Sequence, residues 1–578
     1  MPVKLITTEL GHSLPPEQPH NITFHIPGWE TAKALRRGDP NLLSKLTSIY
    51  PRFGPWCEVR ELSTALHKLL SLPDDYSLIL FIHPDSFTTA QRYSSNTRHR
   101  KPEHLVPPSS LLFRVAEVPI STSSNPSSSP DTTIRLYITA FPAKHAPGVV
   151  GTWQNYGCGI SSRLAAACLA NLPSLTILPF SATGQDNVSL PKLPEPTYLP
   201  LTSAHSNLKT RIVQLAQRAA LDPAKSSLLK KDDIFLYPTG MAAIWRLHNA
   251  LITLRPTGQI LVLGSVFHNS YHLFDESPNG MKHFGRCDAE SNLFDSLEEY
   301  LSAEKRAGRK PAYCFAEFPS NPILVSVDLI RLRKLADKYD FPIVIDDTIG
   351  SSANIDVLPV ADVIVTSITK SLSGYANCMG GSLLLPPHSP LYPLLSPLLT
   401  TTFRNEYFPP DCSLLLSNSH SYLPRTATLN SNALSLATYL HSHSLTPSSP
   451  IKSVLYPPFL DTKPHYTAHL RPPTPDLPQP GYGCLLALDF HSLDQAKTFY
   501  NNLPVHHGPH LGAHLTLAFP FNDAIWGVGD PSAAEYLKTF GANPEQVRIS
   551  VGLEPEEELL DAFRYAIQKA TEAKSHVE

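Results

Sequence analysis

The chain has 578 residues, which at roughly 100–200 residues per domain allows three or four domains and a large buried core. Apolar residues make up 42% and charged residues 17%, a composition that excludes a fibrous or wholly disordered protein. Lys and Arg number 47 against 50 Asp and Glu, a net charge of −3, so we expect no basic surface for nucleic acid.

No apolar run approaches the roughly 18 residues that span a bilayer. The N-terminus has no basic segment followed by an apolar one, as a secretion signal would. We therefore expect a soluble, cytoplasmic protein with no membrane partner. The eight cysteines include no Cys-x-x-Cys pair and are too sparse for a disulfide scaffold, so we expect reduced, mostly buried thiols.

Residues 1–205 form the first predicted region, an N-terminal extension with only weak periodicity. Two stretches within it, 121–133 and 190–201, are rich in Ser and Pro and are typical of surface loops or linkers.

Residues 206–405 form the second predicted region, in which apolar runs alternate with helical patterns. The runs are 259–264, 313–318, 342–347, 362–368 and 381–386. They are apolar on both faces, as parallel strands are, and residues 327–340 between two of them have the spacing of an amphipathic helix. The pattern predicts an α/β fold built on a large, doubly wound, mostly parallel sheet.

Residues 406–578 form the third predicted region, a smaller α+β domain. Its strand-like runs and helices are 483–490, 493–503, 514–519, 546–552 and a terminal helix that begins near Pro555.

Lys370 follows the buried run 362–368 directly and is flanked by the hydroxyl residues Ser367 and Thr369. A lysine at a strand end beside a ligand crevice is well placed for Schiff-base chemistry, because desolvation lowers its pKa and makes the amine nucleophilic. The alternative is a solvated loop lysine.

Asp346 and Asp347 end another strand of the same predicted sheet. One carboxylate at such a position would suit the pyridinium nitrogen of pyridoxal 5′-phosphate, since it keeps the ring protonated. The pair would also suit Mg²⁺ or the cap of the next helix.

Gly240 lies in a predicted turn within 237–251, and Met241 follows it at the start of a predicted helix. Free N–H groups at the start of a helix bind phosphate well, although most such helices bind nothing. Four histidines at 506, 507, 510 and 514 invite a metal interpretation, but Gly508, Pro509 and Gly512 break the helix that such ligands would need. We expect a His-rich loop and no metal.

Five motifs occur in one order along the chain: TGMAAI, EFPSNP, IDDT, SITK and VRISVGLE. In this order they resemble the Cys/Met-metabolism family of fold-type I pyridoxal-phosphate enzymes. Further segments resemble the fungal cystathionine γ-synthases within that family: 9–20, 49–53, 153–165, 377–382 and 481–490.

The resemblance implies a pyridoxal phosphate cofactor bound covalently by Lys370, which would then move protons. It implies that Asp346 pairs with the pyridinium nitrogen. The phosphate would be held by the N–H groups of Gly240 and Met241 and by the hydroxyls of Ser367 and Thr369.

Asn321 would lie near the cofactor and the substrate carboxylate, and Arg548 would bind that carboxylate through two hydrogen bonds. The alternative for Arg548 is an ion pair with Glu554 inside the small domain. Tyr50 and Arg52 match the family's Tyr-x-Arg, which reaches into the active site of the neighbouring subunit. Tyr50 would be a catalytic residue there, and the resemblance therefore implies a homodimer or homotetramer.

Two positions depart from the family. The residue that stacks on the cofactor ring, Tyr in most members, is Phe267 here, which keeps the stacking surface and removes a hydroxyl. The Ser of a Ser-Leu-Gly before the last strand is His510.

The resemblance implies γ-replacement on an O-acyl-L-homoserine, with L-cysteine giving L-cystathionine in transsulfuration and methionine biosynthesis. The alternatives are γ-substitution by a nitrogen or carbon nucleophile in specialised fungal metabolism, a γ- or β-lyase, and a non-catalytic paralogue. Intact Lys370, Asp346 and Arg548 argue against the last of these.

Overall fold

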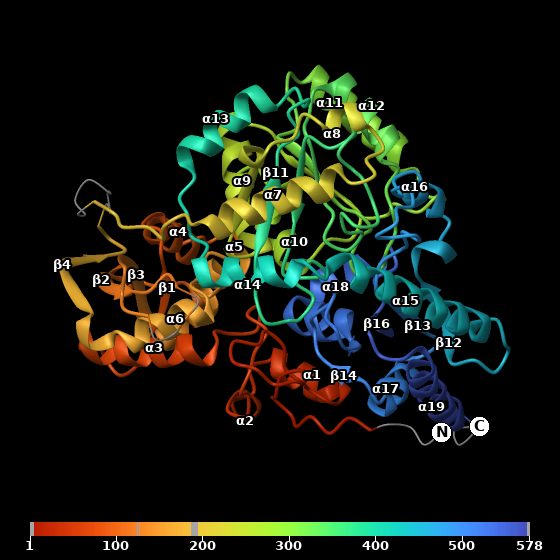
Figure 1. Cartoon of the computed structure of the whole chain (residues 1–578), viewed down its shortest axis with the longest axis horizontal. Helices are drawn as coiled ribbons and strands as arrows, with labels where there is room; N and C mark the ends of the chain where they lie inside the picture. The colour runs from red at the N-terminus through yellow and green to blue at the C-terminus, as the bar shows by residue number, and fades with distance from the viewer. Residues whose placement is uncertain (1–4, 124, 126–127, 187–194, 575–578) are drawn as a thin grey trace.

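The described part of the chain forms three β-sheets that follow one another in sequence, each with its own helices, in the computed structural model (Figure 1). The structure describes all residues except 1–4, 124, 126–127, 187–194 and 575–578. Each sheet falls within one of the three regions expected from the sequence.

The first sheet is antiparallel and has the strand order β1-β3-β2-β4. Its strands are β1 (Tyr76–Phe81), β2 (Leu112–Ile120), β3 (Thr132–Pro142) and β4 (Thr176–Thr183). The accompanying helices are α2 (Pro40–Leu43), α3 (Cys57–Leu69), α4 (Asp85–Ser94), α5 (Gly151–Tyr156) and α6 (Ser162–Ala170).

The two Ser/Pro-rich stretches fall at different places relative to this sheet. The stretch 121–133 connects β2 to β3 and includes the first two residues of β3. The stretch 190–201 comes after β4, and its residues 190–194 lie outside the described part of the chain.

The second sheet has seven strands in the order β5-β11-β10-β9-β8-β6-β7. They are β5 (Ile234–Tyr237), β6 (Ile260–Leu263), β7 (Met281–Phe284), β8 (Tyr313–Glu317), β9 (Ile343–Asp346), β10 (Val363–Thr366) and β11 (Gly381–Leu384). Only β11 runs against its neighbours among these strands, so the prediction of a mostly parallel sheet is confirmed.

Helices cover both faces of this sheet, as the doubly wound pattern requires (Figure 1). They are α7 (Ser203–Gln217), α8 (Pro223–Ser226), α9 (Gly240–Leu254), α10 (His268–Asp275), α11 (Leu293–Arg306), α12 (Leu329–Tyr339), α13 (Tyr392–Thr402) and α14 (Pro409–Ser419). The predicted amphipathic helix is α12, whose apolar stripe is buried in the core.

The third sheet has five strands in the order β12-β13-β16-β15-β14. They are β12 (Ile451–Leu455), β13 (Leu485–Phe490), β14 (His506–His507), β15 (Leu517–Phe519) and β16 (Gln546–Ser550). The helices of this part are α15 (Tyr422–Ser444), α16 (Lys463–Thr467), α17 (Leu493–Asn502), α18 (Pro531–Lys538) and α19 (Glu556–Lys574).

The segment 24–36 lies against the C-terminal sheet and not against the first sheet. Helix α1 (Trp29–Arg36) lies beside α17 (Figure 1), and the N–H of Trp29 donates to the Asn501 side chain at 2.9 Å. The N–H of Ile26 donates to the carbonyl of His507 at 2.9 Å. The chain therefore passes over the small domain before it enters the first sheet.

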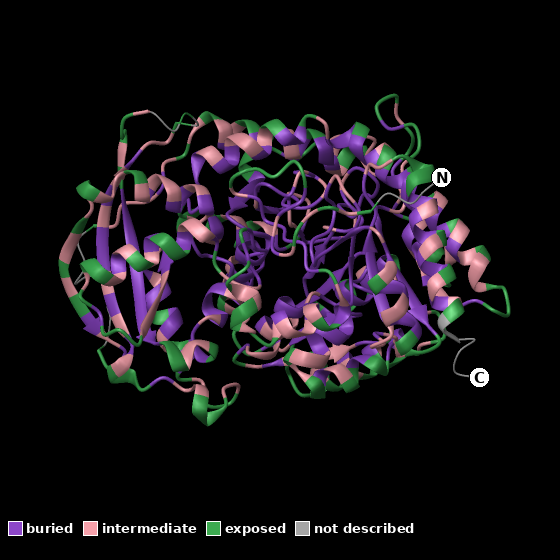
Figure 2. Cartoon of the chain, turned by 90° about the horizontal axis from the view of Figure 1, so that it is seen from below, coloured by how far each residue is buried: buried purple, intermediate pink, exposed green. Residues whose placement is uncertain are grey.

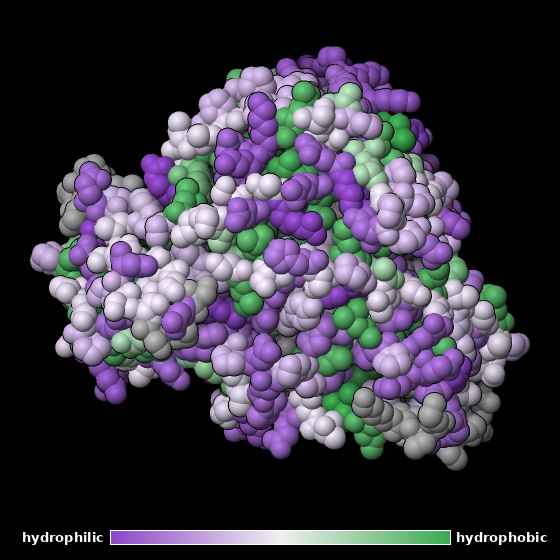
Figure 3. Space-filling model, in the orientation of Figure 1, coloured by the Kyte–Doolittle hydropathy of each residue, from purple (hydrophilic) through white to green (hydrophobic). Residues whose placement is uncertain are grey.

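Most strands are buried and the outer faces of the helices are exposed (Figure 2), whereas β1, β4 and β7 are only partly buried. On the face shown in Figure 3, apolar side chains lie in small groups among hydrophilic ones. None of the helices in the described part of the chain has the length and apolar character needed to cross a bilayer.

Buried histidines join the N-terminal segment to β14, and each is held in a neutral form. His25 Nδ1 accepts from the N–H of His507 at 3.0 Å. His507 Nδ1 accepts from the N–H of Gly28 at 3.3 Å, and its Nε2 donates to the carbonyl of Leu503 at 3.1 Å. Because a protonated imidazole cannot accept a hydrogen bond, a proton on either Nδ1 would break this junction.

We predict that acid weakens the fold through these histidines. Burial lowers the pKa of His25 and of His506 to about 4, while the unfolded value is near 6.5. The unfolded chain therefore binds more protons as the pH falls from about 6.5 towards 4, and stability falls with it by up to about 1.4 kcal/mol per pH unit for each histidine. The charges of His25 and His514 also lower the pKa of His506, and those of His25 and His506 lower the pKa of His507, so charging one histidine opposes charging the next.

The check is the free energy of unfolding against pH for the wild type and for His25→Gln/His506→Gln. The double variant should have a shallower slope between pH 6.5 and 4, whereas exposed His491→Asn should not. Equal slopes in all three proteins would contradict the prediction.

Candidate active site

The functional side chains gather at the carboxyl edge of the central sheet. Strands β8, β9 and β10 end there at Glu317, Asp346 and Thr366, and the turn after β5 leads to Gly240. Ligand sites in open α/β sheets form at this edge, because the loops after parallel strands meet there. The C-terminal domain closes the pocket, with Arg548 among the residues that line it.

Lys370 lies in the turn after β10 and is 8% exposed, so it is not a solvated loop lysine. Its Nζ lies 3.0 Å from the hydroxyl of Tyr50 and 3.4 Å from Nδ1 of His510. Burial lowers the pKa of the Lys370 amine and outweighs the charge of Tyr50 and the hydrogen bond to it, which raise the pKa; the positive charges of Arg548 and Arg52 lower it further. A larger fraction of the amine is therefore uncharged and nucleophilic.

Tyr50 lies wholly within the site and accepts a hydrogen bond from Lys370. Burial would raise the pKa of its hydroxyl, but the charge of Lys370, the hydrogen bond to it, and the charges of Arg52 and Arg548 bring the pKa below its usual value. Lys370 and Tyr50 thus form a pair that shares protons over a short path.

Arg52 lines the same pocket, and its guanidinium contacts the carbonyl of Gln154. The family resemblance implied that Tyr50 and Arg52 serve the neighbouring subunit. In the single chain described, both residues line this pocket, and their service to a neighbouring subunit stays a prediction.

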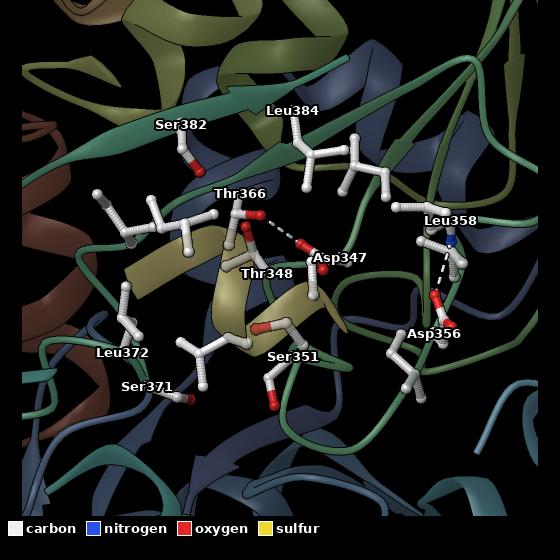
Figure 4. Close-up of a pocket in the computed structure, with 18 of the residues that line it drawn as sticks. Asp347, Thr348, Ser351, Asp356, Leu358, Thr366, Ser371, Leu372, Ser382 and Leu384 are labelled. Atoms are coloured by element: carbon white, nitrogen blue, oxygen red, sulfur yellow. Dashed lines mark hydrogen bonds between the residues drawn. The ribbon is translucent and has the colours of Figure 1, made fainter. Parts of the chain in front are cut away.

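Asp346 and Asp347 point to opposite sides of their strand, as successive strand residues must. Asp346 lines the pocket with Lys370, accepts from the N–H of Thr348 at 3.0 Å, and has its pKa raised to about 6 by burial. Asp347 lines a neighbouring cavity, where it accepts from the Thr366 hydroxyl at 2.5 Å (Figure 4). Of the two carboxylates, only Asp346 faces the candidate site.

The turn before α9 presents unused backbone donors. Its cap is Thr239, whose hydroxyl accepts from the N–H of Ala242 at 2.9 Å. The N–H groups of Gly240 and Met241 have no acceptor among the described residues. A Cβ atom on Gly240 would lie 2.8 Å from the Cβ of Ser367, so only glycine lets the two turns approach this closely.

Ser367 and Thr369 both line the pocket, but the Thr369 hydroxyl is already hydrogen-bonded within the protein. The Thr369 hydroxyl donates to the carbonyl of Gly380 at 3.1 Å and accepts from its N–H at 3.0 Å. Its proton is therefore committed to the protein, which differs from the implied role of Thr369 as a phosphate donor.

Arg548 of β16 is 3% exposed and points into the pocket. Its Nη1 donates to Asn321 Oδ1 at 3.2 Å, its Nη2 donates to the carbonyl of Pro509, and its guanidinium carbon lies 4.4 Å from the ring centre of Phe521. Burial lowers its pKa to about 10. The alternative ion pair with Glu554 is wrong, because that carboxylate accepts instead from the N–H and hydroxyl of Thr516.

Phe267 lines the pocket at the start of α10, and Glu317 holds it there. Glu317 accepts from the N–H of Phe267 at 2.6 Å. Burial and the nearby charge of Asp346 raise the pKa of Glu317 well above its usual value, which favours its protonated form. Sequence reasoning missed Glu317, although it opens the motif EFPSNP.

His510 was expected in a loop, and the structure brings it against Lys370. Burial and the charges of Lys370 and Arg548 lower its pKa far below 6.5, so the imidazole is neutral. Its Nε2 is buried and has no partner among the described residues. The described part of the chain contains no group of three His, Cys, Asp or Glu side chains that could hold a metal ion.

The charges of this pocket fit pyridoxal phosphate. Arg52 and Arg548 are buried cations, and the described residues provide neither of them with a carboxylate partner within 4.0 Å. Unpaired buried charges are costly, so such a set indicates bound anions. A phosphate at Arg52 and Gly240, and a carboxylate at Arg548, would supply them. A pyridinium would supply the cation that buried Asp346 also needs.

Comparison with known proteins agrees with this geometry. The family described as "Cys/Met metabolism PLP-dependent enzyme" matches residues 205–568. The chain therefore belongs to the Cys/Met-metabolism family of pyridoxal-phosphate-dependent enzymes, and pyridoxal phosphate is its cofactor.

Fungal relatives match nearly the whole chain. The cystathionine gamma-synthase-like protein ankD of Aspergillus thermomutatus is 32% identical over 97% of this chain and 95% of its own. The alanine racemase ungC of Aspergillus violaceofuscus is 29% identical over 96% of each chain. The cystathionine gamma-synthase of Neurospora crassa is 27% identical over 98% of this chain and 99% of its own.

Solved structures confirm the fold class. Cystathionine gamma synthase from Xanthomonas oryzae pv. oryzae superposes with a TM-score of 0.52 at 20% identity, covering 64% of this chain and 87% of that one. The confirmed class is an α/β fold with a large, mostly parallel sheet.

We predict that borohydride reduction of the purified protein places a pyridoxyl group on Lys370. Lys209, whose pKa is also lowered by burial, lies outside the pocket and serves as the control. Peptide mapping should show the label on Lys370 in the wild type and in Lys209→Ala, and no label in Lys370→Ala. A label on Lys209 would contradict the assignment.

Proposed function

We propose that this enzyme catalyses γ-replacement on an O-acyl-L-homoserine, with L-cysteine as the nucleophile and L-cystathionine as the product. This places it in transsulfuration and methionine biosynthesis, in the cytoplasm, as a homodimer or homotetramer. The resemblance to fungal cystathionine γ-synthases over nearly the whole chain supports this choice.

One observation carries the proposal: the buried Lys370 amine and the unpaired Arg548 guanidinium face one pocket. Arg548 and Asn321 together offer N–H donors to an α-carboxylate, which fixes the amino acid in one orientation. Lys370 then meets the α-carbon side of the bound substrate. A site of this kind selects an α-amino acid.

The cofactor, when bound, supplies an electron sink that makes protons on the substrate acidic. The protein must then move those protons, and γ-replacement removes one from Cα and one from Cβ. The Lys370 amine is the group placed to take them, and Tyr50 at 3.0 Å can return a proton to it. Pro509 and Leu511 add apolar surface to the lining of the pocket.

A second candidate uses the same residues on other substrates. One relative is named alanine racemase, so a chain similar to this one is named for a different class of reaction. His510 lies 3.4 Å from Lys370 at a position where the family has Ser, so the surroundings of the Lys370 amine differ here, and proton transfer at Cα is the alternative outcome. Two further alternatives are replacement by a nitrogen or carbon nucleophile and elimination in place of replacement. A non-catalytic paralogue is less favoured.

We predict that L-cystathionine forms when the enzyme receives O-acetyl- or O-succinyl-L-homoserine together with L-cysteine. The assay is mass spectrometry of the products across a panel of thiols, amines and β-ketoacids, with Lys370→Ala as the inactive control. An oxoacid released without any nucleophile would indicate a lyase. If no ester reacts but L-alanine is converted to D-alanine, the γ-replacement proposal is wrong.

We predict that Arg548→Lys lowers kcat/KM for the amino acid about ten- to a hundredfold, since lysine keeps the charge but loses the paired geometry. Cofactor absorbance and melting temperature should stay close to those of the wild type. Exposed Arg564→Lys is the matched control and should change neither kinetics nor stability. If Arg548→Lys instead loses the cofactor and melts early, while the fraction that keeps the cofactor has unchanged kinetics, then Arg548 does not bind the substrate carboxylate.

A further inference from the structure

Asp347 lies in a cavity behind the cofactor pocket, on the opposite side of β9 from Asp346 (Figure 4). Hydroxyl side chains of β10, β11 and the turn after β9 line this cavity together with apolar ones. Thr348 and Ser367 line both the cavity and the pocket, and the N–H of Ser367 donates to the Thr348 hydroxyl at 2.8 Å. The two spaces therefore adjoin where β9 and β10 end.

Asp347 ties the end of β9 to the end of β10. The Thr366 hydroxyl donates to Asp347 Oδ1 at 2.5 Å (Figure 4), and the N–H of Asp347 donates to the carbonyl of Val365 at 3.1 Å. Strand β9 ends with Asp346, and the turn after β10 carries Lys370. The tie therefore helps to set the spacing between Asp346 and Lys370.

The Asp347 carboxyl holds its proton up to about neutral pH. It is 4% exposed, and Arg471, which lines the same cavity, pairs with Asp356 at 3.7 Å. Burial and the charge of Asp346 raise the pKa of Asp347 to about 7, although the Thr366 hydrogen bond and the charge of Arg471 oppose the rise. A neutral carboxyl can still accept the Thr366 hydrogen bond through its carbonyl oxygen.

We propose that Asp347 is a positioning residue for Asp346, the carboxylate that would meet the pyridinium nitrogen. Its protonated carboxyl fixes β9 against β10 without adding a second charge beside Asp346. Glu317, opposite Asp346 on β8, also favours its protonated form, so Asp346 is left to carry the negative charge. The proposal rests on the cofactor and on this role of Asp346, not on the nucleophile, so it can fail or succeed independently of γ-replacement.

The test compares pyridoxal 5′-phosphate with 1-deazapyridoxal 5′-phosphate, in which carbon replaces the ring nitrogen, on protein from which the cofactor has been removed. Thr366→Val and Asp347→Leu break the tie, whereas Asp347→Asn keeps an oxygen acceptor for the Thr366 hydroxyl. We expect the two breaking variants to bind pyridoxal 5′-phosphate about tenfold more weakly, as for one lost hydrogen bond to a charged group. Their affinity for the deaza compound should stay within about twofold of the wild type, because it has no nitrogen for Asp346 to meet. Asp347→Asn should keep both affinities within about twofold.

Ser382→Ala is the matched control. It removes a hydroxyl of the same cavity on β11, away from the tie, and should change neither affinity (Figure 4). If Asp347→Leu does not fold, Thr366→Val decides by the same ratio. Equal loss of both compounds in a folded breaking variant, no loss of either, or a wild type that does not prefer the natural cofactor, overturns the proposal.

A second measurement tests the protonated carboxyl without any cofactor. Asp347 ionises near its ordinary value of 3.8 in the unfolded chain and near 7 in the folded one, so unfolding releases a proton between these values. The free energy of unfolding of the wild type minus that of Asp347→Asn should therefore fall from pH 5 to 7 and level off above 7. The other titratable groups that line the cavity, Asp356, Tyr422 and Arg471, are present in both proteins and cancel in the difference. A difference that is flat or rises over this range overturns the proposal.

Discussion

The pocket depends on two buried cations that have no carboxylate counter-ion among the described residues, Arg52 and Arg548, and on the buried amine of Lys370. Arg52 comes from the N-terminal segment, Lys370 from the central sheet and Arg548 from the C-terminal sheet. Burying a charge without a partner is expensive, so the rest of the structure must hold these residues together at a cost in stability. Anionic ligands offset that cost, which links folding of the three regions to binding.

The fold holds the cations by contacts that are distant in sequence. The N-terminal segment crosses the C-terminal sheet at a histidine junction and then brings Tyr50 and Arg52 to the carboxyl edge of the central sheet. Carbonyl groups of α5 hold Arg52, and a carbonyl of the loop after β14 holds Arg548. Neutral carbonyl acceptors orient a guanidinium without neutralising it, so its charge stays available to a ligand.

The sequence predicted β6 and β8 to β11 of the central sheet because these strands are short and mostly apolar, and because α12 between β8 and β9 has a clear amphipathic pattern. It missed β5 and β7, and β7 is only partly buried and contains Lys282 and His283. It also predicted which side chains end those strands, and strand alternation decides between Asp346 and Asp347. The first sheet was missed because its edge strands β1 and β4 are only partly buried, so their apolar pattern is weak. The contacts of His510 with Lys370 and of Gln154 with Arg52 span 140 and 102 residues, and no local pattern reports such pairs.

The most direct test of the account is a crystal structure of the enzyme with pyridoxal phosphate and an unreactive L-amino acid. The account predicts phosphate oxygens within hydrogen-bond distance of Arg52 and of the Gly240 and Met241 N–H groups, and an α-carboxylate on Arg548. A phosphate bound away from Arg52 and the Gly240 turn, or a carboxylate bound away from Arg548, would contradict it.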